Sequence, residues 1–208
     1  MPVSYMEINL NALRHNLRVI RQHLPKEVNV LAVVKANAYG HGVVETLRIA
    51  MEEGYTAAAV ARVEEGAELR RAGFTCPMYV LGLPLPEDML MGVKYDLTLP
   101  VDDTVDLDAF EDIAKGAGKT VEVMMPIDTG MNRIGTHPED VPAFLEKLSH
   151  YPHLHLHGTW THMATADCKD KSAALKQLDR FDEAIAKMPV DDKFVISSAN
   201  SAGVIDIP

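Results

Sequence analysis

The sequence predicts an α/β protein, a (β/α)8 barrel of TIM type that is cut before its eighth strand. Short apolar runs of strand length alternate with segments of helical spacing along all 208 residues, the pattern of repeated βα units with right-handed crossovers. Seven strand patterns follow the first helix, whereas a closed barrel needs eight strands and typically about 250 residues. An open doubly wound sheet would show the same alternation. We therefore expect residues 1–208 to form one domain, an incomplete barrel.

The first part of the chain begins with a helix. Leucine and isoleucine recur at helical spacing between Asn9, which can cap the helix, and Pro25, which stops it. Residues 28–35 are predicted as a strand, because the run is short, rich in β-branched residues and followed by glycines. The next helix, near residues 43–51, ends at Gly54. The remaining elements are a strand at 56–61, a helix at 64–72, a strand at 78–81, a helix at 87–93 and a weak strand at 96–99.

The second part of the chain continues the same alternation, without a linker, tandem repeat or low-complexity segment. Its predicted elements are a helix at 104–114, a strand at 120–127, a helix at 139–149, a strand at 154–161, a long amphipathic helix at 172–187 and a strand at 193–197. The last strand leads into a polar loop that could open a further helix.

Composition excludes several classes of protein. A net charge of −10 argues against a surface for nucleic acid. No apolar segment is long enough to span a bilayer, and residues 1–9 show no secretory signal. Cys76 and Cys168 lie far apart and outside any CxxC pattern. The simplest expectation is a reduced, cytoplasmic protein without a membrane partner.

Lys35 is the first candidate for chemistry. It closes the apolar run at residues 30–34 and precedes a loop that contains Gly40 and Gly42. The end of a buried parallel strand is where α/β barrels place their reactive groups. A lysine in this position can form a Schiff base with a carbonyl compound or with pyridoxal phosphate. The alternative is a lysine that merely extends into solvent from a strand end.

A second candidate is the glycine-containing segment at residues 128–135, Asp-Thr-Gly-Met-Asn-Arg-Ile-Gly, which follows a strand. Its glycines are expected to shape a tight loop that aims Arg133 into the mouth of the barrel. There a guanidinium could hold a phenolate or carboxylate. An arginine in a salt bridge on the rim is equally compatible with the pattern. Asp-Thr-Gly also occurs in aspartic proteases, but those need a β-rich chain and a second aspartate.

Four histidines raise the question of a metal site. His153, His155 and His157 alternate, so on a strand they share one face, and His162 follows. Such a pattern can hold a metal ion and a hydrolytic water. A metal-dependent hydrolase would also need a carboxylate ligand, for which Asp167 is poorly placed within a loop. We therefore expect no metal, and structural roles for most of these histidines.

The seventh strand ends in a segment of small polar residues, 197–203, that could bind an anion. Hydroxyl groups and free N–H groups at a helix start can cradle phosphate, and barrels of this class usually hold phosphate in the loops after strands seven and eight. An ordinary helix cap would have the same composition. Tyr39, four residues after Lys35, could add a hydroxyl from the first loop, or it could be a packed aromatic ring.

Together these segments resemble the alanine racemase family, pyridoxal-phosphate enzymes that interconvert L- and D-alanine. The similar stretches run from Ala-Val-Val-Lys to Gly-His-Gly at residues 32–42, then at 128–135, at Thr-His-Met-Ala-Thr-Ala-Asp, 161–167, and at Ala-Asn-Ser-Ala, 199–202. The likeness extends from Glu7 to the end of the chain. The first stretch is the most specific of them.

The resemblance implies roles in catalysis for two residues. Lys35 would carry pyridoxal 5'-phosphate as a Schiff base and act as base on one face of the substrate. Arg133 would bind the phenolic oxygen of the cofactor and help to place the alanine carboxylate. Two bases on opposite faces would let a proton leave one side and return on the other. The full-length enzyme would be a cytoplasmic homodimer that supplies D-alanine for peptidoglycan.

The resemblance also implies which residues hold the cofactor. Tyr39 and Ser201 would bind its phosphate, and His162 and Asn200 would belong to the network beneath its ring.

The chain departs from the family pattern in two respects. Many members have a lysine, often carbamylated, that supports the arginine; here that position is Pro126, so another partner, such as a bound anion, would have to orient Arg133. The chain also stops before the eighth strand with its arginine and before the C-terminal β domain with the second base. A non-catalytic pyridoxal-phosphate homeostasis protein, which resembles the barrel alone, is therefore an alternative.

Overall fold

The computed structural model describes residues 4–207. Residues 1–3 and 208 lie outside the described part. The first three residues of the segment 1–9, for which the sequence predicts no secretory signal, therefore lie outside the described residues.

Seven parallel strands form the centre of the described chain, residues 4–207, and follow one another in sequence order. They are β1 Leu31–Val33, β2 Ala57–Val60, β3 Met78–Val80, β4 Leu99–Pro100, β5 Val121–Pro126, β6 Leu154–Trp160 and β7 Val195–Ser197. Strands β1 to β3 form one sheet and β4 to β7 another. The two sheets join where Thr98 pairs in parallel with Tyr79. The predicted parallel α/β sheet is thus confirmed, including its seven strands.

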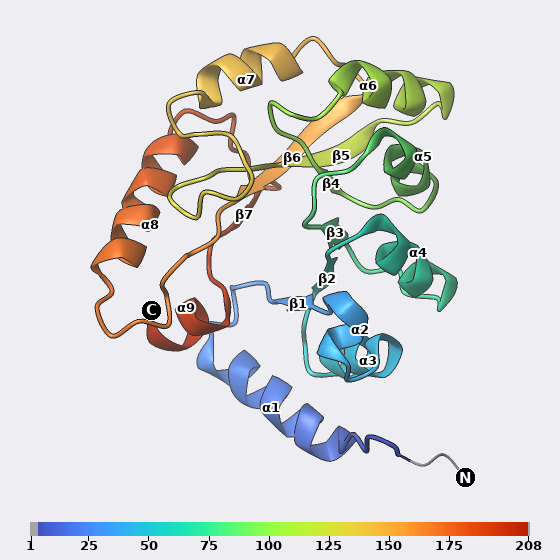
Figure 1. Cartoon of the computed structure of the whole chain (residues 1–208), viewed down its shortest axis with the longest axis vertical. Helices are drawn as coiled ribbons and strands as arrows, with labels where there is room; N and C mark the ends of the chain where they lie inside the picture. Colours follow the sequence, from blue (N-terminus) through green and yellow to red (C-terminus); the bar gives the residue numbers. More distant parts are fainter. Residues whose placement is uncertain (1–3, 208) are drawn as a thin grey trace.

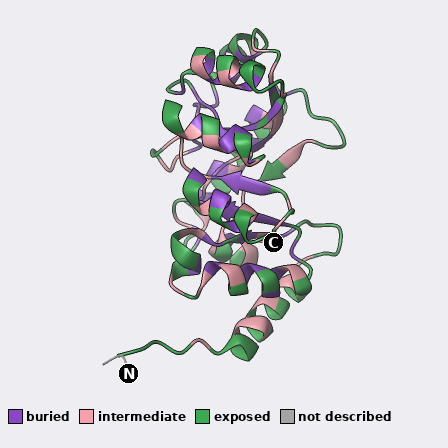
Figure 2. Ribbon diagram, turned by 90° about the vertical axis from the view of Figure 1, so that its right-hand side faces the viewer, coloured by how far each residue is buried: buried purple, intermediate pink, exposed green. Residues whose placement is uncertain are grey.

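Helices surround the strands on the outside (Figure 1). They are α1 Leu10–His23, α3 Val43–Glu52, α4 Val63–Arg71, α5 Pro86–Lys94, α6 Leu107–Gly116, α7 Val141–Leu148, α8 Ser172–Ile185 and α9 Ser201–Asp206. A single turn labelled α2, Lys35–Tyr39, follows β1. Buried residues gather in the strands and on the inner sides of the helices, and exposed residues face outward (Figure 2). This is the layering of a TIM-type barrel.

The barrel is open on one side. Within residues 4–207, β1 pairs only with β2, and β7 pairs only with β6. A groove lies between these two edge strands, lined by β1, by residues 196–201 and by the inner side of α1. The two edges therefore keep backbone groups that no neighbouring strand satisfies.

The interior of the barrel has its own small apolar cluster. Ala57 and Ala59 on β2 are buried against Tyr79 on β3 and Met124 on β5. Alanine side chains leave the space that the larger tyrosine and methionine fill, which is how the inward positions of a small barrel are packed. Two of its members, Tyr79 and Met124, also line the cavity described below.

Each described strand is at least one residue shorter than the sequence predicts, and two of the predictions need a closer comparison. Residues 28–35 were expected as one strand, but β1 covers only Leu31–Val33, because pairing to β2 begins with the bond from Thr56 N–H to the carbonyl of Val30. Residues 96–99 were expected as a weak strand, whereas β4 is Leu99–Pro100. The polar segment after the last strand does open a helix, α9.

Cys76 and Cys168 are both free thiols. Among residues 4–207, no helix combines the length and the apolar character that crossing a bilayer requires.

Candidate active site

A cavity of about 400 Å³ opens at the carboxyl ends of the strands, the end at which barrels of this class hold their active sites. All six residues that the sequence singles out for cofactor or substrate line it: Lys35, Tyr39, Arg133, His162, Asn200 and Ser201. Its apolar wall includes Leu31, Tyr79, Met124, Trp160 and Val195. An apolar pocket with a few convergent polar groups is the usual form of a small-molecule site.

Lys35 leads directly into an unusual turn. The next four residues, Ala36 to Tyr39, all have positive φ angles, between +51° and +54°. Left-handed helical conformation costs an L-residue roughly 1–2 kcal/mol, so four in succession require strong support from their surroundings. The sequence predicts a loop here. It does not predict positive φ angles, because the stretch contains no glycine before Gly40.

Hydrogen bonds hold the far end of this left-handed turn. The side-chain oxygen of Asn37 accepts a bond from Val43 N–H at 2.8 Å, which ties the turn to the start of α3. The N–H groups of Gly40 and Gly42 both donate to the carbonyl oxygen of Asn37. Tyr39, at the end of the turn, remains 61% exposed. Its hydroxyl group is therefore available at the rim of the cavity.

The loop after β5 is shaped by a buried aspartate. The carboxylate of Asp128 accepts bonds from Gly130 N–H at 2.9 Å and Asn132 N–H at 3.0 Å. Thr136 N–H donates to the carbonyl of Pro126 at 3.0 Å and closes the loop. The carboxylate of Asp128 is thus used to fold the loop that carries Arg133, and not as half of a catalytic aspartate pair.

Arg133 is exposed and lines the cavity. Among residues 4–207 its guanidinium has no ion pair and no hydrogen bond, so the alternative of a rim salt bridge is not observed in the described chain. Backbone contacts orient its loop instead, because Gly135 N–H donates to the carboxylate of Asp102 at 3.2 Å. Asp102, which is buried and lies two residues after β4, thus supports the loop in a protein whose Pro126 offers no polar side chain for that purpose.

His162 follows β6 and is partly buried. Burial lowers the pKa of its imidazole, and the positive charges of Arg133 and Lys35 lower it further. The imidazole is therefore neutral at neutral pH, and it can accept or donate a hydrogen bond without adding a third positive charge to the cavity.

Gln177 on α8 was not predicted, yet it fixes two of the loops. It is only 5% exposed, and its amide nitrogen donates to the hydroxyl of Thr129 at 3.2 Å and to the carbonyl of His162 at 3.0 Å. Its amide oxygen accepts from Ala164 N–H at 2.9 Å. A signal was present, since Gln177 falls at helical spacing between two buried positions of α8.

The loop after β7 places its two predicted residues at the start of α9. Asn200 caps this helix by accepting a bond from Gly203 N–H at 3.0 Å. Its amide nitrogen donates to the carbonyl of Met163 at 3.1 Å and so joins the loop to that after β6. Ser201 is exposed at the first position of α9 and is one of the residues that line the cavity.

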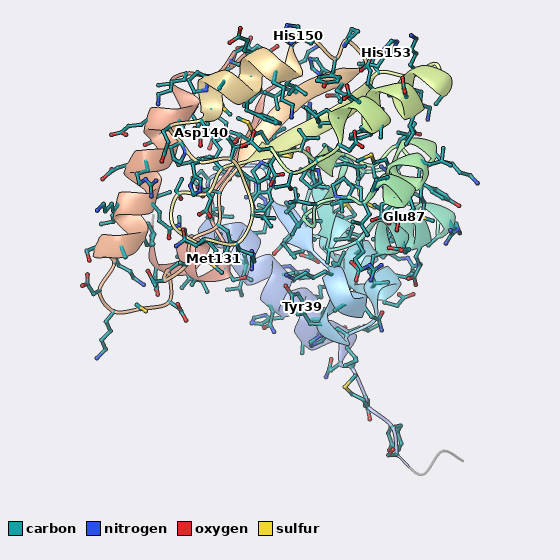
Figure 3. All side chains as sticks on the ribbon, turned by 45° about the horizontal axis from the view of Figure 1, so that its top comes forward. Tyr39, Glu87, Met131, Asp140, His150 and His153 are labelled. Atoms are coloured by element: carbon teal, nitrogen blue, oxygen red, sulfur yellow. The ribbon has the colours of Figure 1, made fainter. Side chains whose placement is uncertain are left out.

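The three alternating histidines lie elsewhere and pair with carboxylates. His153 contacts Glu111 at 2.6 Å, while His155 and His157 contact Glu122 at 2.8 and 3.3 Å. In Figure 3, His153 lies at the opposite end of the view from Tyr39. No group of three or more histidine, cysteine, aspartate or glutamate side chains in residues 4–207 is arranged to hold a metal ion.

Known proteins are similar in sequence and in fold to most of this chain. The family model of the alanine racemase N-terminal domain matches residues 8–208. An alanine racemase from Methanococcus maripaludis is 37% identical over 98% of the chain and 56% of its own length. The solved alanine racemase of Clostridium difficile superposes with a TM-score of 0.90 at 36% identity, over 97% of this chain and 56% of its own. A histidine racemase from Leuconostoc mesenteroides superposes with a TM-score of 0.84 at 30% identity, over 95% of this chain and 53% of its own. The chain thus spans about half the length of these relatives.

Proposed function

The chain belongs to the alanine racemase family, and from this premise we propose that it forms the cofactor-holding barrel of a pyridoxal-phosphate-dependent racemase that interconverts L- and D-alanine. The observation that carries the proposal is the convergence of Lys35, two hydroxyl groups, a guanidinium and a neutral imidazole on one apolar cavity. These groups come from the ends of β1, β5, β6 and β7.

The donor groups of the cavity fit pyridoxal 5'-phosphate. The primary amine of Lys35 suits its carbonyl group. The hydroxyls of Tyr39 and Ser201 suit a phosphate, and the guanidinium of Arg133 suits a phenolate or carboxylate. His162 and Asn200 would support the ring from the loops after β6 and β7. When bound, the cofactor supplies an electron sink for the negative charge that develops at Cα.

Within this arrangement, Lys35 is proposed to move the proton at Cα on one face of the amino acid. Arg133 is proposed to hold the substrate carboxylate and so to fix which face Lys35 meets. The apolar wall around Trp160 and Tyr79 excludes water from the reacting centre. Residues 128–135 and 161–164 present Arg133 and His162 on loops that buried hydrogen bonds already hold in place.

Racemisation also needs a proton donor on the opposite face. Tyr79 lines the cavity, but its hydroxyl points toward His157 at 3.5 Å, and Tyr39 is proposed for phosphate. The chain spans about half the length of its relatives. We therefore propose that the second base belongs to the part of the whole protein outside these residues, and that it acts across a homodimer.

Alanine is proposed as the substrate because the relatives from Methanococcus maripaludis and Bacillus subtilis are named alanine racemases. A relative named as a histidine racemase, at 30% identity, shows that similar barrels serve different amino acids. The proposed setting is the cytoplasm, where the product would serve peptidoglycan synthesis.

The proposal is tested by racemisation of L-alanine with added pyridoxal phosphate. Loss of one acid–base group commonly costs about 10²- to 10⁴-fold, so the 208-residue chain alone should turn over slowly. Addition of the C-terminal half of a whole relative should raise the rate. A non-catalytic carrier would bind the cofactor but gain no activity in this mixture.

A further inference from the structure

A glutamate on α4 reaches the backbone beside Lys35. One carboxylate oxygen of Glu65 accepts a bond from Ala36 N–H at 2.7 Å. The other oxygen accepts from Ala61 N–H at 2.7 Å and from Arg62 N–H at 3.1 Å. A single side chain thus joins the loop after β1 to the loop after β2.

We propose that Glu65 is a positioning residue that holds the left-handed turn after Lys35, and so sets how Lys35 and Tyr39 face the cofactor. The inference rests on the proposed function, and it assigns Glu65 no contact with substrate or cofactor.

An ordinary helix cap explains only part of this geometry. A glutamate at the third position of a helix commonly accepts a bond from the capping residue, which accounts for the contact with Arg62. The contact with Ala36 lies 29 residues away in sequence and belongs to another βα unit. This bond is therefore additional to the needs of α4.

The carboxylate of Glu65 accepts hydrogen bonds from backbone N–H groups. Among residues 4–207, no lysine, arginine or histidine lies within ion-pair distance of its carboxylate. A carboxylate accepts such bonds about twice as strongly as a neutral group. Glutamine of the same shape would turn its NH₂ group toward the N–H of either Ala36 or Ala61, and one loop would be released.

The turn needs this support because its conformation is costly. Asn37 and Gly40 secure its far end, whereas Glu65 secures its first residue, next to Lys35. Released at that end, the turn would relax toward the right-handed or extended regions that Ala36 prefers. The amine of Lys35 and the hydroxyl of Tyr39 would then no longer be placed to contact the same bound molecule.

The test compares Glu65→Gln with Glu64→Gln in the full 208-residue chain. Glu64 is an exposed neighbour on α4 that pairs with Arg62 at 3.3 Å, so its replacement is a matched control. Each protein is incubated with pyridoxal 5'-phosphate and reduced with borohydride, and the label on each lysine is measured by peptide mass mapping. Hydrogen exchange of the Ala36 amide is followed without cofactor.

Glu65→Gln is expected to unfold at nearly the wild-type temperature, while label on Lys35 falls at least about tenfold, since small misplacements of reacting groups cost that much or more. Glu64→Gln should label Lys35 as the wild type does. Equal labelling in Glu65→Gln and the wild type overturns the proposal. If Glu65→Gln fails to fold, Glu65→Asp decides: its shorter side chain keeps the charge but cannot span both loops, so low labelling supports the proposal and full labelling overturns it.

The amide measurement separates this inference from the proposed function. An unlabelled Lys35 in the wild type would overturn the function. Faster exchange at Ala36 in Glu65→Gln would still support the role of Glu65 in holding the turn, and unchanged exchange would overturn it.

Discussion

The hydroxyl oxygens of Thr129 and Thr161 lie 2.8 Å apart in the interior, and this bond joins the loop after β5 to the loop after β6. Gln177 donates to the same Thr129 hydroxyl from α8. One buried polar network therefore fixes the loops that carry Arg133 and His162. In a low-dielectric interior such a network is stabilising only when each of its members is paired.

Replacement of Gln177 by methionine should be costly, although the side chains are similar in size. It would leave the carbonyl of His162 and the N–H of Ala164, both only partly buried, without this partner; a fully buried unpaired group costs roughly 1–3 kcal/mol. We expect the free energy of unfolding to fall by about 1–3 kcal/mol in urea titrations. Lys176→Ala, at an exposed position of the same helix, is the control. Equal stability of Gln177→Met and the wild type would contradict the network.

His162 should make the stability depend on pH. Its pKa is lowered in the folded protein from 6.5, first by burial and then by Arg133 and Lys35. The unfolded chain therefore binds more protons, so the free energy of unfolding is at its full value above about pH 6.5 and declines as the pH falls through the lowered pKa. His162→Gln should reduce this decline between neutral and mildly acidic pH. An identical pH profile for the variant would show that the imidazole is not held neutral.

The open side of the barrel should make the chain self-associate. Val33 on β1 is 40% exposed and Ile196 on β7 is 46% exposed, and both lie on edge strands that invite pairing with another chain. Ile196→Lys should lower the apparent mass in sedimentation velocity at a given concentration. Leu175→Lys, a comparable change on the outer side of α8, should not. A wild-type chain that stays monomeric at high concentration would argue against exposed edges.

Much of the fold could be predicted from the chain alone, because each element has a strong local signal. The helix spacing of residues 172–187 and the apolar run at 120–127 each anticipate an element closely, α8 and β5. The weak strand near residue 99 was placed less well, since Leu99 and Pro100 pair with β5 while only Thr98, just before them, pairs with β3. The pairing partner, and not the sequence of the segment, decides where such a short strand begins.

Short motifs predicted which residues line the cavity, whereas the contacts made only in the folded protein could not be predicted from them. Lys35 and Arg133 stand in recognisable segments, and the structure brings both to one cavity. The left-handed turn at Ala36 to Tyr39 could not be predicted, because alanine and tyrosine have no local preference for positive φ. Glu65 and Gln177 act through backbone groups that are remote in sequence. Their partners become apparent only when the strands have been arranged in the sheet.

The central claim is that Lys35 holds pyridoxal phosphate in this cavity, and covalent trapping tests it most directly. The full 208-residue chain is titrated with pyridoxal 5'-phosphate, reduced with borohydride and mapped by peptide mass spectrometry, beside Lys35→Ala. We predict one dominant pyridoxyl group on Lys35 at about one equivalent of cofactor, and its loss, with weakened cofactor binding, in Lys35→Ala. Label spread over surface lysines, or equal cofactor binding by Lys35→Ala and the wild type, would contradict this assignment.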